Sequence, residues 1–380
     1  MSQKIIIYTH PFDPISNFNI HIANEAAIAT NADIVYLVPS YYGPYGKKHL
    51  STDQERLHMC RLAIPHFYKP VFRISSYELL QKEKSNCYDT LEYFQNLHPD
   101  AELFLLVDIE TLTTFTEIFN VAKIVAIAQI ICYKNPNQPE INFGYWAHQK
   151  ILYLNDVNYL NHKTSLGLKP QIENLHPKVL EYINQYGVFA HARLKENLSE
   201  KRYQHCLTVA KTAIKITQIY NQIANHWDQS EKQRLVADVY IAGLYHDLCK
   251  EFKPRDLIDI ARNQLKIKWW PSYQVLHGPV AAWWLKNKYF INNNRILSAV
   301  AQHTIPIENN PEIATKIIFL ADHLEPKRLE DWGKEKFHYF WNLIENQQID
   351  QCYQEVLVAL KNLHSSSDNE TEKFVYPLKF

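Results

Sequence analysis

The sequence predicts an α/β domain followed by an all-α domain. In residues 4–134, short aliphatic and β-branched runs alternate with amphipathic segments, a pattern typical of a parallel sheet covered by helices. From residue 202 onward the apolar residues recur at helical spacing, and we find no convincing strand. The polar stretch 190–201 separates the two patterns. We therefore predict domains over residues 1–189 and 190–366 and a polar tail over residues 367–380.

The first domain is expected to be a Rossmann-like parallel sheet that begins with a strand, a tight loop and a helix. The strand covers residues 4–10, the loop lies around Phe12, and a helix-like run starts near Asn17. Many nucleotide-binding sheets begin in this way. Further strands are predicted over residues 32–40, 70–76, 102–108 and 125–133. Helices are predicted over residues 51–64, 86–98, 111–124 and 176–189, the last of them ending at Gly187.

The composition argues against broad binding to polyanions. Lys+Arg and Asp+Glu both number 40, so the formal charge is zero. The sequence has no apolar stretch long enough to span a membrane and no secretory leader. Its six cysteines are scattered without a CxxC pair, which is typical of free thiols in a reducing compartment. We expect a cytoplasmic protein that binds neither extended nucleic acid nor membrane, and a homo-oligomer is compatible with this composition.

The second domain is expected to be helical throughout, and polar residues continue several of its apolar stripes. His246 shares a helix face with Val239 and Ala242, and His205 shares one with Val209. Such side chains should point into the domain interior. Asp322 lies one turn after an apolar residue in the same way. The predicted helices cover residues 202–222, 231–250, 254–266, 279–288, 294–304, 311–325 and 334–363.

Inward carboxylates beside several imidazoles point to a metal centre. A buried carboxylate is costly unless it is paired or bound to a metal. Nitrogen and oxygen ligands without thiolate suit iron, manganese or zinc. Six ligands exceed what one catalytic metal takes, so we predict two divalent ions that share Asp247 and activate a bridging water. The predicted ligands are His205, His246, Asp247, His277, His303 and Asp322, whereas His323, His338 and His364 are left outside the set.

The order H…HD…H…H…D, with its flanking residues, resembles the HD-domain phosphohydrolases. Within them it is most similar to the YqeK-type enzymes, which hydrolyse diadenosine tetraphosphate (Ap4A) symmetrically with a dinuclear iron centre. The matching blocks are RYQH, HDLCK, LHGPVAA, QHT and LADHLEP, over about residues 200–330. A departure from the family is that Ile305 and Pro306 follow His-Thr, where members often carry a small residue and glycine.

The resemblance implies a role for each matching residue. His205, His246, Asp247 and Asp322 would hold one metal; His277 and His303 would complete the second, with Asp247 bridging. Asp247 and Lys250 would be the catalytic residues, with Lys250 stabilising charge on the attacked phosphate. Thr304 and Arg328 would contact phosphates. The resemblance favours iron over manganese or zinc.

The first 187 residues resemble bacterial nicotinate mononucleotide adenylyltransferases. The matching blocks are Phe12-Asp13-Pro14, VPSYYGPYGKKHL, QERLHMCRLAI, DTL at residues 89–91 and HPKVLEYINQYGVF. The resemblance implies transfer of an adenylyl group from ATP, with Mg²⁺ accompanying ATP. Such enzymes mainly position phosphates and neutralise charge.

Several phosphate-handling residues of that family are replaced in this chain. Thr9 and His10 stand at glycine positions of the first loop, while Ser16 and Asn19 stand at its histidine positions. The late Ser-Ser-Thr-x-Ile-Arg block aligns only with residues 158–163. His10 or His21 could supply a cation, and Lys163 could replace an arginine. The candidate nucleotide-binding residues of this domain are Thr9, His10, Phe12, Asn19, Lys47, Lys48 and Lys163.

Three functions are therefore open. The leading hypothesis is a bifunctional enzyme that joins an adenylyltransferase to a di-metal phosphohydrolase, with nucleotides and dinucleotide polyphosphates as its ligands. The alternative keeps the hydrolase and makes the first domain a catalytically inactive, nucleotide-binding or structural module. The third hypothesis is non-enzymatic, with the histidines serving as core residues or structural ligands.

Overall fold

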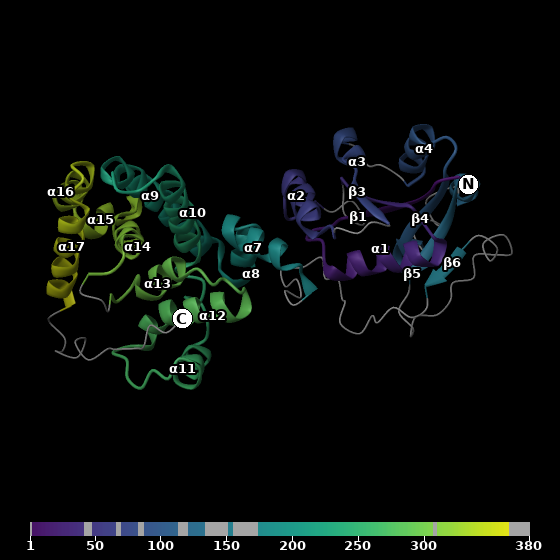
Figure 1. The fold of residues 1–380 in the computed structure, drawn as a ribbon. Helices are drawn as coiled ribbons and strands as arrows, with labels where there is room; N and C mark the ends of the chain where they lie inside the picture. Colours follow the sequence, from purple (N-terminus) through teal and green to yellow (C-terminus); the bar gives the residue numbers. More distant parts are fainter. Residues whose placement is uncertain are drawn as a thin grey trace. The chain divides into compact units, whose positions relative to one another are not determined.

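A computed structural model of the chain describes residues 2–41, 48–65, 70–82, 87–112, 121–133, 151–154, 174–306 and 310–364. The chain forms two compact units, Met1–Tyr182 and Ile183–Phe380, and each is described here by itself (Figure 1). The predicted tail, Lys47 and Lys163 lie outside the described residues.

The first unit contains a six-stranded parallel sheet in the order β3-β2-β1-β4-β5-β6. Ile5 on the central strand pairs with Ile34 of β2 on one side and with Leu103 of β4 on the other. The chain builds one half of the sheet outward from β1 and then returns to build the other half from β4. The strands are β1 (Lys4–His10), β2 (Ile34–Pro39), β3 (Val71–Ile74), β4 (Glu102–Asp108), β5 (Ala128–Tyr133) and β6 (Ile151–Leu154).

Helices bury both faces of this sheet, so the strands read as continuous apolar runs. Ile5 and Ile7 join a core cluster with Phe94 of α4 and Ile124 of α6. Ile6 lies between them on the strand and is equally buried, which places it on the opposite face. The helices are α1 (Asn17–Thr30), α2 (Asp53–Ala63), α3 (Tyr77–Gln81), α4 (Cys87–Leu97) and α6 (Val121–Ile127).

The described part of the second unit contains helices and no strand. Helices α9, α10, α13 and α14 pack against one another and form its centre, and α12 packs on α13. Most of the apolar residues of these helices belong to one buried cluster. The helices are α8 (Ala190–Asn197), α9 (Glu200–Ile223), α10 (Gln229–Tyr245), α11 (Pro254–Asn263), α12 (His277–Lys288), α13 (Asn294–Gln302), α14 (Ile313–Leu324), α15 (Leu329–Trp332), α16 (Lys334–Glu345) and α17 (Ile349–His364), and α7 (Pro177–Tyr186) spans the division between the units.

The structure corrects several predicted boundaries. The polar stretch 190–201 contains a full helix, α8, because Leu194 and the buried Arg193 give it an inward face. The predicted strand 125–133 begins only at Ala128, since the preceding residues continue α6. The predicted helix 334–363 is two helices, because Gln347 adopts a left-handed conformation between them. β6 and α3 were not predicted; both are short, with four and five residues.

Candidate metal centre

Six buried side chains from five helices meet inside the second unit. His205 comes from the first turns of α9, and His277 begins α12. His246 and His303 are the residues that follow α10 and α13. Asp247 follows His246, and Asp322 lies near the end of α14. All six have at most 8% of their surface exposed. Their side chains therefore point inward, as the apolar stripes of their helices indicate.

Two close helix contacts bring the imidazoles together. Gly243 of α10 lies so near Ala210 of α9 that a Cβ at position 243 would stand 2.7 Å from the Ala210 Cα. Gly278 of α12 has the same role against α13, because its Cβ would stand 2.9 Å from the carbonyl oxygen of Ala301. These contacts let α9 approach α10 and let α12 approach α13 more closely than any larger residue allows.

The first pair of imidazoles faces both carboxylates. The Nε2 atoms of His205 and His246 lie 3.3 Å apart. Each of these atoms lies 3.6 Å from Oδ2 of Asp247. Asp322 approaches from the other side, with Oδ1 at 3.1 Å from the His205 Nε2 and at 3.9 Å from the His246 Nε2.

The second pair faces the other oxygen of the same aspartate. The Nε2 atoms of His277 and His303 lie 2.9 Å apart. They stand 3.0 and 3.7 Å from Oδ1 of Asp247. Asp247 thus turns one oxygen to each pair. Three overlapping triads among these six residues have ligand atoms close enough to hold a metal ion: His205–His246–Asp247, His246–His303–Asp322 and Asp247–His277–His303.

Partners on the far side of each ring make Nε2 the atom presented to the centre. Nδ1 of His246 donates to the Gly243 carbonyl at 2.7 Å, and Nδ1 of His303 donates to the Val300 carbonyl at 2.8 Å. Nδ1 of His277 donates to the Gln274 carbonyl. A neutral imidazole that donates through Nδ1 carries its lone pair on Nε2, which is the form that binds metal.

His205 is oriented by a carboxylate instead. Its Nδ1 lies 3.0 Å from Oε1 of Glu325, which is 2% exposed. The other Glu325 oxygen, Oε2, is buried and has no hydrogen-bond partner among the described residues. A carboxylate behind a ligating histidine fixes the ring and raises its basicity. The sequence analysis assigned Glu325 no function.

The charge states of both aspartates and of His246 and His277 suit cation binding, whereas His205 must release a proton before its Nε2 can bind a metal. Burial opposes the charge of Asp247, yet the surrounding imidazoles hold its pKa well below the ordinary value. The pKa of Asp322 is likewise lowered by His205 against the effect of burial. Burial lowers the pKa of His246 to about 4 and also lowers that of His277. For His205, burial is outweighed by the hydrogen bonds that its ring donates to Asp322 and Glu325, which raise its pKa to about 9.

Cationic side chains stand at the rim of the centre. Arg202 donates through Nη1 to Oδ2 of Asp247 at 2.7 Å, although sequence reasoning assigned it no role. Arg328 donates through Nη2 to Oδ1 of Asp322 at 3.4 Å and through Nε to the Asp322 carbonyl at 3.1 Å. Lys250 is close enough to His277 to lower its pKa. The buried hydroxyl of Thr304 has no hydrogen-bond partner among the described residues.

The first unit has a second candidate site at the carboxyl ends of β1 and β4, where the strand order reverses. In parallel sheets, ligands bind outside the carboxyl ends of the strands at such a point. His10 ends β1 and Asp108 ends β4, and the two side chains interact electrostatically. Partial burial nevertheless lowers the pKa of His10 to about 4. The expectation that His10 supplies a cation is therefore wrong near neutral pH, while His21 is an exposed residue of α1.

The other predicted residues of this site have internal partners. The Thr9 hydroxyl donates to the buried Glu78 at 2.9 Å. Asn19 completes the capping box of α1, because its Oδ1 accepts from the backbone N–H of the N-cap residue Ser16. Its Nδ2 donates to the Tyr8 hydroxyl at 3.0 Å. Phe12 is fully buried in a left-handed conformation, and Lys48 is exposed.

Buried polar contacts hold the first loop in place. Nη1 of Arg56, on α2, donates to the carbonyls of Pro11 and Ser40 at 2.9 and 2.6 Å. Asp13 accepts from the backbone N–H of Leu50 at 2.6 Å and from the Ser51 hydroxyl. The matching Phe12-Asp13-Pro14 block thus fixes the loop to the segment that follows β2.

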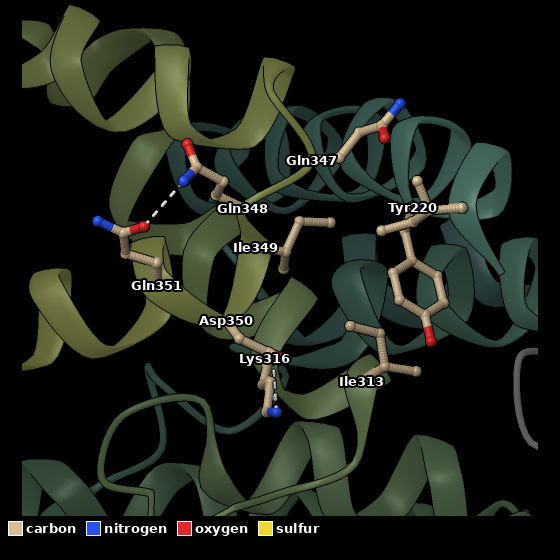
Figure 2. A pocket seen from close by; sticks show the side chains of 9 residues that line it. Tyr220, Ile313, Lys316, Gln347, Gln348, Ile349, Asp350 and Gln351 are labelled. Atoms are coloured by element: carbon tan, nitrogen blue, oxygen red, sulfur yellow. Dashed lines mark hydrogen bonds and ion pairs between the residues drawn. The ribbon is translucent and has the colours of Figure 1, made fainter.

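A cavity of about 290 Å³ lies between the end of α9 and the starts of α14 and α17. Figure 2 shows Tyr220, Ile313 and Ile349 around it. Lys316 reaches this cavity, but its Nζ is bound to Asp350 at 2.7 Å and to Asn310 at 2.6 Å. Its charge is therefore neutralised, and we do not place a phosphate substrate there. None of the described helices combines the length and apolarity needed to cross a membrane.

Both units match known protein families. The family model described as HD domain matches residues 202–327, and the one described as cytidylyltransferase-like matches residues 8–169. The HD match contains all six side chains of the centre. An HD domain implies binding of a divalent metal, and the donor set described above fits that chemistry.

Three curated proteins illustrate the similarity. A Mycoplasma genitalium protein named "Probable nicotinate-nucleotide adenylyltransferase/Ap4A hydrolase" is 30% identical over 340 residues, which cover 88% of this chain and 91% of that protein. The Staphylococcus aureus "Bis(5'-nucleosyl)-tetraphosphatase, symmetrical" is 38% identical over 136 residues, 35% of this chain and 63% of that protein. A Clostridium tetani "Probable nicotinate-nucleotide adenylyltransferase" is 31% identical over 135 residues, 35% of this chain and 66% of that protein.

Proposed function

The chain belongs to the family of nicotinate-nucleotide adenylyltransferase/Ap4A hydrolase fusion proteins, and from this premise we propose that it is a bifunctional nucleotide enzyme. Its helical unit hydrolyses Ap4A or a related dinucleotide polyphosphate into two nucleoside diphosphates. Its α/β unit transfers an adenylyl group from ATP to nicotinate mononucleotide. The length of the match, 91% of the fusion relative, favours this function over a hydrolase with a binding-only first unit.

One observation carries the hydrolase assignment: Asp247 turns one oxygen to each of two imidazole pairs. This arrangement supports two cation positions that share a carboxylate, with His205, His246 and Asp322 at the first and His277 and His303 at the second. Two such divalent ions supply a hydroxide nucleophile near neutral pH and neutralise charge on phosphate oxygens. The donors are nitrogen and oxygen alone, which suits iron, manganese or zinc. We favour iron because of the resemblance to the YqeK-type enzymes.

The chain's own residues position the phosphates. Lys250 stands beside His277 and would neutralise charge on the attacked phosphate. The Thr304 hydroxyl, which has no partner among the described residues, would donate to a phosphate oxygen, since a buried hydroxyl without a partner is costly. Arg328 is 35% exposed, so its guanidinium can reach a ligand while it is held by Asp322.

The decisive experiment for this unit combines elemental analysis with product identification. Purified full-length protein should contain close to two divalent ions per chain. It should convert Ap4A into ADP alone, and chelation should stop the reaction. Metal-loaded protein that releases no nucleotide from any dinucleotide polyphosphate would exclude the hydrolase.

For the α/β unit, the proposal rests on two supports. The strand order reverses between β1 and β4, and the fusion relative is named as an adenylyltransferase. ATP with Mg²⁺ would bind there, and Lys48 would face its phosphates from the exposed segment after β2. Lys47 and Lys163 complete the proposed set. Thr9 and Asn19 would contribute through the loop they stabilise, because their polar atoms already have partners.

The test for this unit is an assay of the full-length protein with ATP, Mg²⁺ and nicotinate mononucleotide. Release of pyrophosphate together with the dinucleotide supports adenylyl transfer. Binding of ATP without pyrophosphate release would support a binding-only unit instead. We also propose a domain boundary at residues 189/190, which limited proteolysis tests. A cytoplasmic location and a homo-oligomer are further proposals, tested by cell fractionation and by sedimentation.

A further inference from the structure

Arg202 lies at the edge of the candidate metal centre and is held there by a hydrogen bond to Asp247. Its Nη1 donates to Oδ2 of Asp247 at 2.7 Å. The N-cap residue of its helix is Ser199, whose backbone N–H and hydroxyl donate to the Glu251 carboxylate at 2.6 and 2.7 Å. The turn after α10, residues 247–251, is therefore hydrogen-bonded to the start of α9 at both ends, through Asp247 at one end and Glu251 at the other. The guanidinium itself is held at the centre by its hydrogen bond to Asp247.

The guanidinium also keeps donors for a ligand. It carries five N–H groups, and the bond to Asp247 is the one hydrogen bond of this group that we find among the described residues. The side chain is 32% exposed, whereas the Asp247 side chain is 4% exposed. Arg202 therefore extends from the buried carboxylate toward solvent, where its remaining N–H groups can reach a ligand.

Arg328 holds the matching position on the other carboxylate. Its Nη2 donates to Oδ1 of Asp322, and its side chain is 35% exposed. The Asp247 and Asp322 oxygens that these arginines contact lie 3.6 and 3.1 Å from one atom, the His205 Nε2. Two arginines thus reach the same imidazole through different carboxylates. Arginine suits this position because its planar fork binds phosphate through two parallel hydrogen bonds.

A dinucleoside tetraphosphate has two phosphates on each side of its central bridging oxygen. Symmetrical hydrolysis adds the oxygen of water to one phosphorus next to this bridge and breaks that phosphorus–oxygen bond. The leaving diphosphate takes up a proton, and two nucleoside diphosphates result. An enzyme that chooses the central bridge must bind the phosphates on both sides of it.

Building on the proposed hydrolase, we infer that Arg202 and Arg328 grip the phosphates on opposite sides of the central bridge, and that Arg202 sets which bridge is cleaved. Arg202 is a specificity-determining residue: it binds a phosphate that is not attacked. Without Arg202, the phosphate chain of Ap4A can shift by one phosphate relative to the metal centre. Cleavage at a neighbouring bridge then releases ATP and AMP.

The experiment compares full-length wild-type protein with Arg202→Ala and Arg202→Lys, all loaded with the same metal, on Ap4A. Wild type should yield ADP alone. Arg202→Ala should raise KM about ten- to a hundredfold, as expected for loss of a charge-assisted hydrogen bond, and should release ATP and AMP as well. Arg202→Lys keeps the charge without the fork and should fall between. Arg255→Ala is the control, because that exposed arginine of α11 pairs only with Asp259 among the described residues.

Each other outcome has a definite meaning. If Arg202→Ala keeps both the wild-type KM and ADP as its single product, the inference is wrong while the hydrolase stands. If Arg202→Ala and Arg202→Lys both lose bound metal, Arg202 serves to hold Asp247, which also overturns the inference. A metal-loaded wild type that yields no ADP overturns the proposed function and the inference with it.

Discussion

His277 and His303 place their Nε2 atoms 2.9 Å apart while Nδ1 of each ring faces a main-chain carbonyl. Two lone pairs that point at each other at this distance repel unless a proton or a cation lies between them. The Nε2 atoms of His205 and His246 lie 3.3 Å apart, and there the raised pKa of His205 keeps a proton on that ring, which relieves the conflict. The helices therefore hold four imidazoles in a geometry that is favourable only when positive charge is shared among them.

Replacement of Asp247 by Ala should remove both cations and stop hydrolysis, because both of its oxygens face imidazole pairs. We expect turnover to fall by more than ~10³-fold, the scale seen when a central member of a catalytic set is deleted. Elemental analysis and ADP release measure the effect. Asp259→Ala, an exposed substitution on α11, is the control, and retained metal in Asp247→Ala would contradict the ligand assignment.

Glu325→Gln should weaken metal binding, since the carboxylate that orients His205 becomes a neutral amide. Changes of this kind cost about ten- to a hundredfold in metal affinity or activity. Competition with a chelator gives the dissociation constant. The exposed Glu330→Gln on α15 should leave it unchanged. Equal affinity in Glu325→Gln and wild type would show that the Nδ1 contact has no role in binding.

Lys250→Ala should lower turnover and leave the metal content unchanged, because Lys250 lies beside His277 without being a ligand. We expect a loss of about 10²–10³-fold, comparable to removal of one transition-state donor. Single-turnover kinetics with parallel elemental analysis separates the two effects. The exposed Lys253→Ala is the control. Loss of metal from Lys250→Ala would mean that this lysine supports the centre itself.

His10 should make stability depend on pH. Its folded-state pKa is about 4, below the unfolded value of roughly 6.5. The unfolded chain therefore binds a proton first, and the stability contributed by neutral His10 is complete above pH 6.5 and is lost as the pH falls toward 4. In His10→Asn, the free energy of unfolding of the full chain should fall less steeply over this window. Parallel curves for the two proteins would refute the shift.

Gly243→Ala should destabilise the helical unit, because the new methyl group would collide with the Ala210 backbone. Overpacking of this kind costs about 1–3 kcal/mol. Separation of α9 from α10 should also move His205 away from His246 and weaken metal binding. Chemical denaturation and metal titration test the two effects, with Lys211→Ala on the exposed face of α9 as the control. Wild-type stability and affinity in Gly243→Ala would contradict the close contact.

The inward direction of the six polar side chains was predictable from the sequence because they continue apolar stripes. His246 continues the face of Val239 and Ala242, and all three are fully buried. Arg202 and Glu325 were not readable in the same way. Arg202 gains its meaning from a residue 45 positions away, and Glu325 from one 120 positions away. Local periodicity says which side faces inward and does not say what it meets there.

The sheet was predictable where its strands are buried on both faces, as in β1 and β4, since continuous aliphatic runs are strong signals. The short edge strand β6 has only half-buried residues and gave no such signal. α8 was missed because its buried face includes Arg193, which lies 4.4 Å from the centre of the Tyr289 ring. Sequence patterns predict an exposed position for an arginine, even where, as here, the arginine is buried against an aromatic ring.

The single carboxylate of Asp247 has a thermodynamic consequence for loading. Its two oxygens belong to one rigid group, so orienting it toward the first imidazole pair also orients it toward the second. The first ion to arrive therefore preorganises the position of the next. Uptake should be cooperative, so that a titration shows empty and doubly loaded protein with few singly loaded molecules.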